Sequence, residues 1–235
     1  MHKQPKPFKS PPKKYHPRGL TVLYEDHDLL VVDKRGGLLT IAYREQEQEI
    51  SVHELLMNYV RKGNSKSRNR VFTVHRLDRD TSGLLVFVKS EEARAYMIEQ
   101  WPTFTKTYMA VIGGFLSEKE GTITSYLAED DEYKVASVKN ARDGALASTG
   151  YKVIQESSKC SLLEISLHTG KKNQIRVHLS EMGHPVLGDK KYGDRTPGLK
   201  KMALHAARID VKHPFTHEPM TFEAPIPSFF KFLMQ

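Results

Sequence analysis

The sequence predicts an α+β fold, a largely antiparallel mixed sheet with helices packed on it, and three observations support that class. The chain has 235 residues, of which 39% are hydrophobic and 27% charged, a balance typical of a globular protein with one sizeable core. Short segments with strand-like alternation outnumber segments with helical spacing. The strand-like segments follow one another directly, and this order favours antiparallel pairing over an alternating βαβ array.

In the first half of the chain, strands are predicted at residues 20–24, 29–33, 71–74, 84–89 and 105–112. Ser51 is a favoured N-cap for a helix over residues 51–61. The apolar stripe of that helix consists of Val52, Leu55, Leu56 and Tyr59. Ser90 caps a second helix that runs to about Trp101, and Glu91 and Glu92 suit its positive end.

In the second half, strands are predicted at residues 122–126, 133–138, 148–154, 161–167, 204–211 and 221–223. A helix is predicted at residues 173–182, because Ile175, Leu179 and Met182 fall on one stripe. A short helix through Phe229, Phe230 and Leu233 ends the prediction.

Positive charge is concentrated in two segments, although the net charge is only +8. Residues 1–18 and residues 61–76 each contain six Lys or Arg and no acid, so the rest of the chain is net negative. This distribution favours a polyanionic partner such as nucleic acid. The competing interpretation is a solubilising tail and a solvated loop. Five prolines accompany the first segment, which predicts a disordered basic arm at residues 1–18 and a folded domain at residues 19–235.

Several classes of protein are excluded by composition. One cysteine, Cys160, forms neither an internal disulfide nor a Cys-based structural zinc site. No apolar run approaches the ~20 residues of a membrane span, and the N-terminal residues lack the apolar core of a secretory signal. We therefore expect a cytoplasmic protein without membrane contact.

The densest polar cluster lies at residues 74–83, between two apolar strands. Asp78 stands there between Arg76 and Arg79, and a nearby guanidinium keeps a carboxylate ionised and oriented, as a nucleophile or base requires. The alternative is a strand-joining loop whose polar side chains bond their own backbone.

Two further segments are candidates. Residues 168–179 end a strand and open a helix, so their backbone N–H groups suit a phosphate; the alternative is a solvated helix start with ordinary surface cations. Tyr108 follows Lys106 in a predicted strand, where a tyrosine usually serves packing. No P-loop and no G-x-G-x-x-G motif is present. The histidines offer two possible metal-ligand sets, His75 with Asp78 and Asp80 or His178 with His184 and Asp189. Neither has a known metal-ligand spacing, and we expect no metal.

The order of these segments resembles the RluA-type family of RNA pseudouridine synthases, over roughly residues 20–227. The shared motifs are YED at 24–26, LLVVDK at 29–34, GLL at 37–39, HRLDRDTSGLLV at 75–86, KTY at 106–108, TG at 169–170, QIRVHL at 174–179, GHPVLGD at 183–189, YG at 192–193 and LHA at 204–206. The resemblance implies a pseudouridine synthase catalytic domain at residues 19–235. It also implies an isomerase that acts on ribosomal RNA and/or tRNA, as a monomer and without a cofactor.

The resemblance also implies roles for individual residues. Asp78 is the catalytic carboxylate, Arg176 pairs with it, and Tyr108 lies against the uracil face, where it can stack and help to remove the C5 proton. Arg76 fills the gap left by the flipped nucleotide, since base extrusion costs stacking energy. The remaining assignments are RNA binding by Arg79, Lys106, Lys171, Lys172 and Gln174, and a pocket lined by Ile175 and Leu204.

The chain departs from the family pattern in two places. Lys34-Arg35 replaces the usual Lys-Pro, and residues 170–174 read GKKNQ where the family usually has Gly-Arg-x-His-Gln. Lysine is a poorer bidentate phosphate ligand than arginine, so we expect these departures to affect RNA binding rather than the reaction. Many members also carry an N-terminal S4 RNA-binding domain, and we expect a short member that lacks it.

Two alternatives come from other classes. The chain could be an RNA-binding ribosome-assembly factor without catalysis, but a pure binder has no need of Asp78, Tyr108 and Arg176 together. It could also be a metal-dependent nuclease, which EDTA would inactivate while leaving a synthase active.

Deletion of residues 1–18 tests the predicted arm. We expect weaker RNA binding and a shallower slope of log affinity against log salt concentration, because fewer phosphates are neutralised. Filter-binding titrations at several salt concentrations measure that slope. The same slope for the full and truncated chains would show that the arm does not contact RNA.

Overall fold

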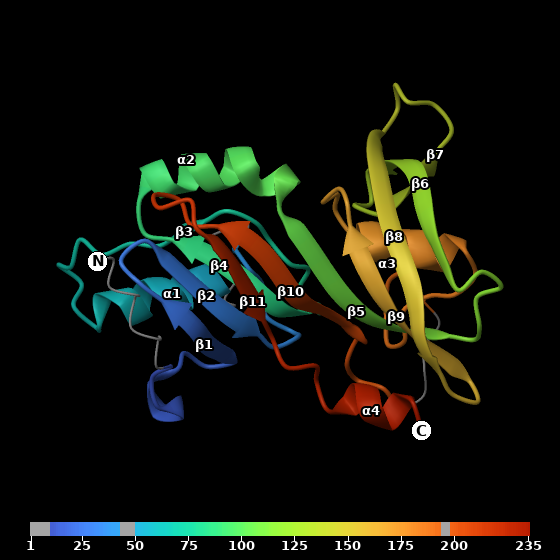
Figure 1. Cartoon of the computed structure of the whole chain (residues 1–235), viewed down its shortest axis with the longest axis horizontal. Coiled ribbons are helices and arrows are strands. Elements are labelled where there is room, and N and C mark those ends of the chain that lie inside the picture. The colour runs from blue at the N-terminus through green and yellow to red at the C-terminus, as the bar shows by residue number, and fades with distance from the viewer. Residues whose placement is uncertain (1–9, 43–49, 194–197) are drawn as a thin grey trace.

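The computed structural model describes residues 10–42, 50–193 and 198–235, and a mixed sheet forms its centre (Figure 1). The strands are β1 (Leu20–Glu25), β2 (Leu29–Lys34), β3 (Phe72–Thr73), β4 (Ser82–Val88), β5 (Thr105–Gly113), β6 (Glu120–Glu129), β7 (Val135–Val138), β8 (Ala145–Glu156), β9 (Cys160–Leu167), β10 (Leu204–Lys212) and β11 (Pro219–Glu223). The helices are α1 (Val52–Arg61), α2 (Glu91–Gln100), α3 (Gln174–Glu181) and α4 (Phe229–Leu233), with short 3₁₀ helices η1 (Lys13–Tyr15) and η2 (Trp101–Thr103). Every predicted strand and helix is present, with ends shifted by a few residues.

The strand order is β1-β2-β4-β10-β5-β9-β8-β6-β7, and β3 and β11 pair with β4 and β10. The pairing of β10 with β4 is parallel, and the other strand pairs are antiparallel. The predicted α+β class with a largely antiparallel mixed sheet is therefore confirmed.

The β1–β4 half of the sheet is covered on both faces. In β2, Leu30 and Val32 face the core cluster that contains α1, while Leu29 and Val31 face the cluster that contains α2. Successive side chains of a strand point to opposite faces, so α1 and α2 lie on opposite sides (Figure 1). This is why the sequence of β2 reads as a continuous apolar run.

The β6–β9 half packs against α3, and long β5 connects the two halves (Figure 1). Residues 174–179 of α3 are all buried. Ile175 and Leu179 join the main core, whereas Val177 packs with residues of β6, β7 and β8. The helix is therefore packed on several sides, which contradicts the alternative of a solvated helix start.

The helix starts follow local sequence as predicted. The Ser51 side chain accepts a hydrogen bond from the backbone N–H of Glu54, and the Glu54 carboxylate accepts one from the backbone N–H of Ser51, which completes a capping box. The Ser90 hydroxyl accepts from the Ala93 N–H at 3.1 Å. Such caps satisfy N–H groups that a helix leaves unpaired at its start.

The structure describes the second half of the predicted arm. Residues 10–18 contain η1, and the Ser10 hydroxyl donates to the Val22 carbonyl of β1. The disorder of residues 1–18 stays a prediction. Residues 1–9 lie outside the described residues. Within the described ranges, no helix is long and apolar enough to cross a membrane.

Gly83 allows the two strands beside the polar loop to approach each other. Its φ is +111°, and an added Cβ would stand 2.2 Å from the carbonyl oxygen of Ala206, its partner in the parallel pairing of β4 and β10. Only glycine combines this conformation with so close a backbone contact. Gly83 therefore fixes the point at which the polar loop joins β4.

Replacement of Gly83 by alanine tests this constraint. We expect Gly83→Ala to lower the free energy of unfolding by more than ~2 kcal/mol, because both the backbone conformation and the strand spacing must change. Gly63→Ala is the matched control, since Gly63 also has positive φ but no atom within 4 Å of an added Cβ, and it should cost ~1 kcal/mol. Equal losses in urea denaturation would contradict the close-contact argument.

Candidate active site

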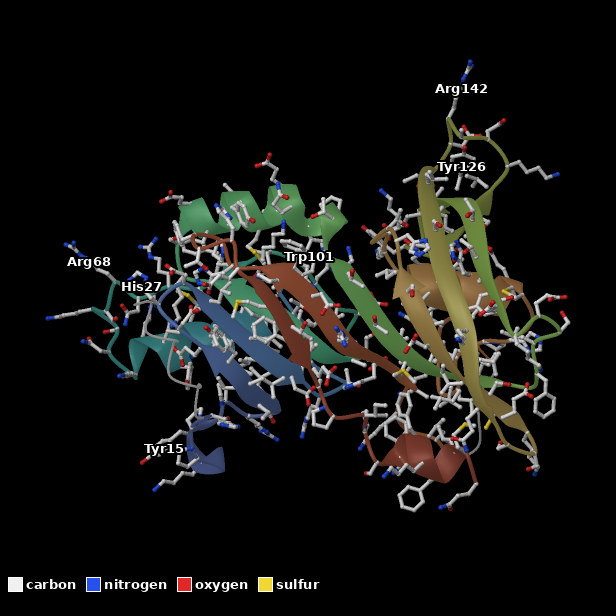
Figure 2. All side chains as sticks on the ribbon, viewed as in Figure 1. Tyr15, His27, Arg68, Trp101, Tyr126 and Arg142 are labelled. Atoms are coloured by element: carbon white, nitrogen blue, oxygen red, sulfur yellow. The ribbon has the colours of Figure 1, made fainter. Side chains whose placement is uncertain are left out.

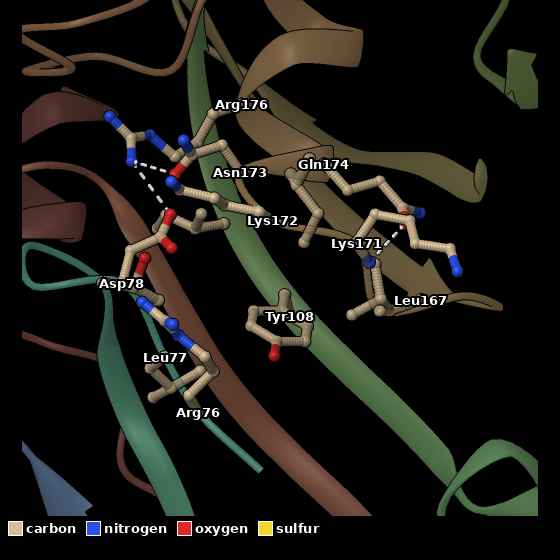
Figure 3. Close-up of a pocket in the computed structure, with 14 residues that line it drawn as sticks. Arg76, Leu77, Asp78, Tyr108, Leu167, Lys171, Lys172, Asn173, Gln174 and Arg176 are labelled. Atoms are coloured by element: carbon tan, nitrogen blue, oxygen red, sulfur yellow. Dashed lines mark hydrogen bonds and ion pairs between the residues drawn. The ribbon is translucent and has the colours of Figure 1, made fainter. Parts of the chain in front are cut away.

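A pocket of about 150 Å³ lies between the 74–81 loop and the start of α3, with β5 as its floor. Its volume corresponds to roughly five water molecules in the liquid, which is room for one planar ring rather than for a stretch of polymer. Figure 3 shows Asp78, Tyr108 and Arg176 converging on it from three different elements. The described residues that line it include Arg76, Leu77, Asp78, Thr81, Tyr108, Lys171, Lys172, Asn173, Ile175, Arg176 and Leu204. We refer to it as the Asp78 pocket.

The backbone on each side of Asp78 is held in place. The Thr40 hydroxyl donates to the Leu77 carbonyl at 2.9 Å and accepts from the Leu77 N–H at 3.1 Å. On the other side, the Arg79 carbonyl accepts from the Lys34 ammonium at 2.9 Å and from the Gly37 N–H at 2.8 Å. Asp78 is therefore presented by a rigid loop rather than by a mobile one.

Lys34 is fully buried, which is unusual for a lysine. Its ammonium donates to the carbonyl oxygens of Arg35, Leu38 and Arg79, so all three of its N–H donors have acceptors. Burial lowers the pKa of Lys34 to about 8, against the opposing charges of Asp80 and Asp78. The side chain is therefore still mostly charged at pH 7 and serves as a cross-link beneath the loop.

Arg176 forms ion pairs with two carboxylates at once. Its Nη1 donates to Asp78 at 2.9 Å, while Nε and Nη2 donate to the two oxygens of Asp189 at 2.6 and 2.8 Å. Bidentate pairing of this kind fixes the plane of a guanidinium. Asp189 therefore aims the remaining nitrogen of Arg176 at Asp78.

Asn173 and Tyr192 complete the support of the guanidinium. The Asn173 side-chain oxygen accepts from Arg176 Nη1 at 2.8 Å, and its amide donates to the Tyr192 hydroxyl at 3.0 Å. The Tyr192 ring lies 5.0 Å from the guanidinium carbon, within cation–π range. Asn173 has φ +54°, a conformation that asparagine tolerates better than most residues. Asn173, which stands where the family usually has histidine, thus supplies a hydrogen-bond acceptor to Arg176.

Burial and charge set the protonation states around the pocket. Burial opposes the charge of Arg176, yet hydrogen bonds and charges from Asp189 and Asp78 raise its pKa above the usual value. Burial acts to raise the pKa of Asp189, but its pairing with Arg176 prevails and lowers it. Burial, and then the Asp78 charge, raise the pKa of Tyr108, so its phenol is protonated at physiological pH.

The predicted site residues divide into two groups. Asp78, Tyr108, Arg176, Ile175 and Leu204 meet at the Asp78 pocket, together with the cations Arg76, Lys171 and Lys172. Gln174 also borders it, but its amide is occupied internally: it accepts from Thr169 and Lys171 and donates to Ser148 and Thr149.

Lys106 and Arg79 lie off the wall of this pocket. The Lys106 ammonium donates to the Trp101 carbonyl at 3.0 Å, and the residue is buried. Arg79 belongs to the same loop as Asp78, but it is exposed and does not line this pocket. Their binding to RNA, like that of Gln174, stays a prediction.

Five supporting residues were not among the predicted site residues: Asp189, Asn173, Tyr192, Thr40 and Lys34. Asp189 and Lys34 stand inside recognised motifs, so the motifs marked their positions but not their partners. Lys34 in a strand that begins with the apolar run of residues 29–32 is a local signal, because a buried cation needs acceptors. Nothing in the sequence near Thr40 pointed to Leu77.

The histidine sets considered as metal ligands are used otherwise. His75 accepts from the Val86 N–H at 2.9 Å, and His178 hydrogen-bonds Thr149 and Ser125. Both carboxylate oxygens of Asp189 are hydrogen-bonded to Arg176. These contacts favour structural roles for both histidines.

One ligand-like cluster exists among the described residues, formed by Asp26, Asp28 and His213. His213 Nδ1 accepts from the backbone N–H groups of Phe215 and Thr216, which leaves Nε2 to donate to Asp26 at 3.3 Å. Asp26 also accepts from the N–H groups of Asp28 and Leu29. The polar groups of Asp26 and His213 are thus used in hydrogen bonds that join two turns. The cluster lies outside the Asp78 pocket.

Comparisons with known proteins show which family the chain belongs to. The sequence model of the family described as RNA pseudouridylate synthase matches residues 28–181. The uncharacterized RNA pseudouridine synthase YhcT of Bacillus subtilis (strain 168) is 36% identical over 213 residues, which are 89% of this chain and 69% of that protein. The ribosomal large subunit pseudouridine synthase D of Nitrosomonas europaea is 33% identical over 229 residues, with 92% and 64% covered.

Solved structures show the same fold. The human RNA pseudouridylate synthase domain containing protein 4 superimposes with a TM-score of 0.74 at 23% identity, covering 89% of this chain and 90% of that one. Fold, site and relatives together define an enzyme of the class that rearranges uridine within RNA. The chain belongs to the RNA pseudouridylate synthase family.

Removal of Asp189 tests its support of Arg176. We expect Asp189→Ala to lower the free energy of unfolding at pH 7 by about 3–5 kcal/mol, because a buried guanidinium loses its bidentate partner. The matched control is Glu156→Ala at the surface pair with Lys119, which should cost less than ~1 kcal/mol.

The pH dependence of the same variant has a defined sign. Because the pKa of Asp189 is lowered on folding, its contribution is present above its unfolded pKa of about 3.9 and is lost as the pH falls through the folded value. The stability difference between wild type and Asp189→Ala should therefore shrink below about pH 4. A difference that stays constant into strong acid would contradict the ion-pair interpretation.

Proposed function

We propose that this enzyme isomerises specific uridines of ribosomal RNA and/or tRNA to pseudouridine, with Asp78 as the catalytic carboxylate. One observation carries the proposal: the Asp78 carboxylate is held against Arg176 in a pocket with room for one base. The side chain of Asp78 is 21% exposed and that of Arg176 only 9%. The carboxylate is therefore accessible from the pocket while its cationic partner stays behind it.

The reaction needs a carboxylate near the sugar. The C1′–N1 bond breaks, the freed uracil rotates, a C1′–C5 bond forms, and the proton leaves C5 while N1 gains one. Atoms and electrons balance, so the proposal includes no redox cofactor or energy source. Cationic character develops at C1′ as the first bond breaks, and Asp78 can respond by attacking C1′ or by taking the 2′ proton.

Tyr108 supports the base in this proposal. Its ring projects from β5 and lies between the loop of Asp78 and the residues before α3 (Figure 3). A uracil in the pocket would therefore contact the Tyr108 ring. Its raised pKa favours a protonated phenol, which suits stacking and hydrogen bonding more than direct acceptance of the C5 proton. Arg176 acts through Asp78, because its Nη1 hydrogen bond holds the carboxylate in one orientation.

The cations at the mouth of the pocket suit the RNA backbone. Arg76 and Lys172 come from opposite walls, and Arg76 is placed to enter the space that a flipped nucleotide leaves. Lys172 also pairs with Glu129. Because lysine binds phosphate as a point charge, we expect Lys171 and Lys172 to contribute affinity more than orientation.

The choice of RNA rests on relatives. Two of them are named ribosomal large subunit pseudouridine synthase D, which supports a ribosomal target, and tRNA stays in the proposal beside it. We also propose that the enzyme works in the cytoplasm as a monomer and without a metal ion. Activity that survives EDTA would separate it from a metal-dependent nuclease.

Tritium release tests the reaction. RNA labelled at uridine C5 is prepared from cells that lack this gene, so that the target sites are unmodified, and is fractionated into ribosomal RNA and tRNA. We expect wild-type protein to release tritium from at least one fraction and Asp78→Ala to release less than about 1/1,000 as fast, since the catalytic carboxylate is gone. RNA binding by the variant should stay within a few fold of wild type.

Asp80→Ala is the matched control, an aspartate of the same loop that does not line the Asp78 pocket, and it should keep most of the activity. Turnover by Asp78→Ala would contradict the assignment of Asp78 as the catalytic carboxylate. No release by wild type, with RNA binding intact, would favour the RNA-binding assembly factor.

A further inference from the structure

A second hollow, of about 390 Å³, adjoins the Asp78 pocket. The two share the side chains of Arg76, Tyr108 and Leu167 and the residues Gly170 and Lys171 in their walls. A polymer with one unit in the Asp78 pocket would therefore bring its next unit against this hollow. We call it the Trp101 hollow, after the indole in its wall.

The Trp101 side chain is a flat surface that its neighbours hold in place. His75 stacks against it with ring centroids 4.1 Å apart and an interplanar angle of 21°. Phe104 meets it edge-on at 6.0 Å. Burial lowers the pKa of His75 to about 3, so the stacked imidazole is neutral and the pair is an aromatic, uncharged unit. A side chain already fixed in this way loses little conformational entropy when a ligand binds.

The charge of the hollow suits a phosphodiester chain. Of the described residues that line it, Arg76, Lys106 and Lys171 are cationic and none is acidic. Figure 2 places Trp101 below the C-terminal end of α2, on the side that faces β8 and β9. An aromatic surface surrounded by cations is the combination that binds single-stranded nucleic acid, with stacked bases and neutralised phosphates.

We propose that the Trp101 hollow binds the base of the nucleotide next to the target uridine, with Trp101 as its packing surface. The inference rests on the proposed function, because the uracil in the Asp78 pocket sets the register of the RNA. It makes Trp101 a specificity-determining residue, because the position beside the target uridine must carry a base. Stacking tolerates any base, so we expect discrimination between a base and an abasic position rather than a preference for one hydrogen-bond pattern.

The sequence provides its own reporter, since Trp101 is the single tryptophan of the chain. The probe is an RNA hairpin with a stem of G·C pairs and an adenosine loop that contains one uridine. Two analogues carry an abasic ribose on the 5′ or the 3′ side of that uridine. Saturation with the intact hairpin is expected to quench the tryptophan emission. Removal of one neighbouring base should abolish most of the quenching and weaken binding about tenfold, whereas removal of the other should have little effect.

Variants of Trp101 separate stacking from an indirect response. Measured by calorimetry, Trp101→Phe keeps an aromatic face and should retain the tenfold penalty for the abasic hairpin. Trp101→Leu should bind the intact and abasic hairpins equally. Phe232→Leu, at a side chain of α4 that is 70% exposed, is the remote control and should behave as wild type.

An unchanged emission at saturation, or the same abasic penalty in Trp101→Leu as in wild type, would overturn the inference. Its failure is distinguishable from that of the proposed function. Tritium release without quenching leaves the isomerase and removes the subsite. Quenching with the abasic penalty, but without tritium release, leaves a base-binding protein and removes the isomerase.

Discussion

The site depends on one guanidinium that lies between two carboxylates. Arg176 connects Asp78, which comes from the loop before β4, with Asp189, which follows α3. These groups belong to the two halves of the sheet, so the ion pairs also join the halves at the pocket. A buried arginine is costly unless all its donors have partners. That requirement explains why Asp189, Asn173 and Tyr192 surround it.

The remaining structure delivers Asp78 to this guanidinium. Glycine at position 83 lets β10 approach β4 closely, which fixes the exit of the loop. Thr40 and Lys34 then hold the backbone on each side of Asp78. The helices α1 and α2 cover the two faces of β2 and β4 and make that half rigid. Precise placement of a catalytic group needs this kind of support, since small displacements lose much of the rate.

The basic residues serve different purposes once they are placed in space. Arg76, Lys171 and Lys172 gather at the Asp78 pocket. Lys62, Arg68 and Arg70 border a separate hollow with Tyr59, and Figure 2 shows Arg68 at the opposite end of the molecule from Tyr126. Lys34 is inside the protein. The run of charge at residues 61–76 is therefore two features: a remote basic surface and a single arginine at the site.

The sequence by itself determined the elements of the fold and indicated the candidate site residues. The apolar run at residues 29–32 of β2, the caps Ser51 and Ser90, and the polar motif around Asp78 are patterns within a few residues, so they could be predicted from the local sequence. The pairing of Arg176 with Asp78 came from family resemblance. Spacing alone could not indicate it, because the two residues are 98 positions apart.

Only the tertiary structure decided the partners. Asp189 as the second carboxylate, Thr40 beside Leu77, and the burial of Lys34 and Lys106 all depend on how distant segments pack. The same packing placed Trp101 beside the Asp78 pocket. Such contacts arise from long-range strand order and from the need to satisfy every buried polar group, and neither leaves a local mark in the sequence.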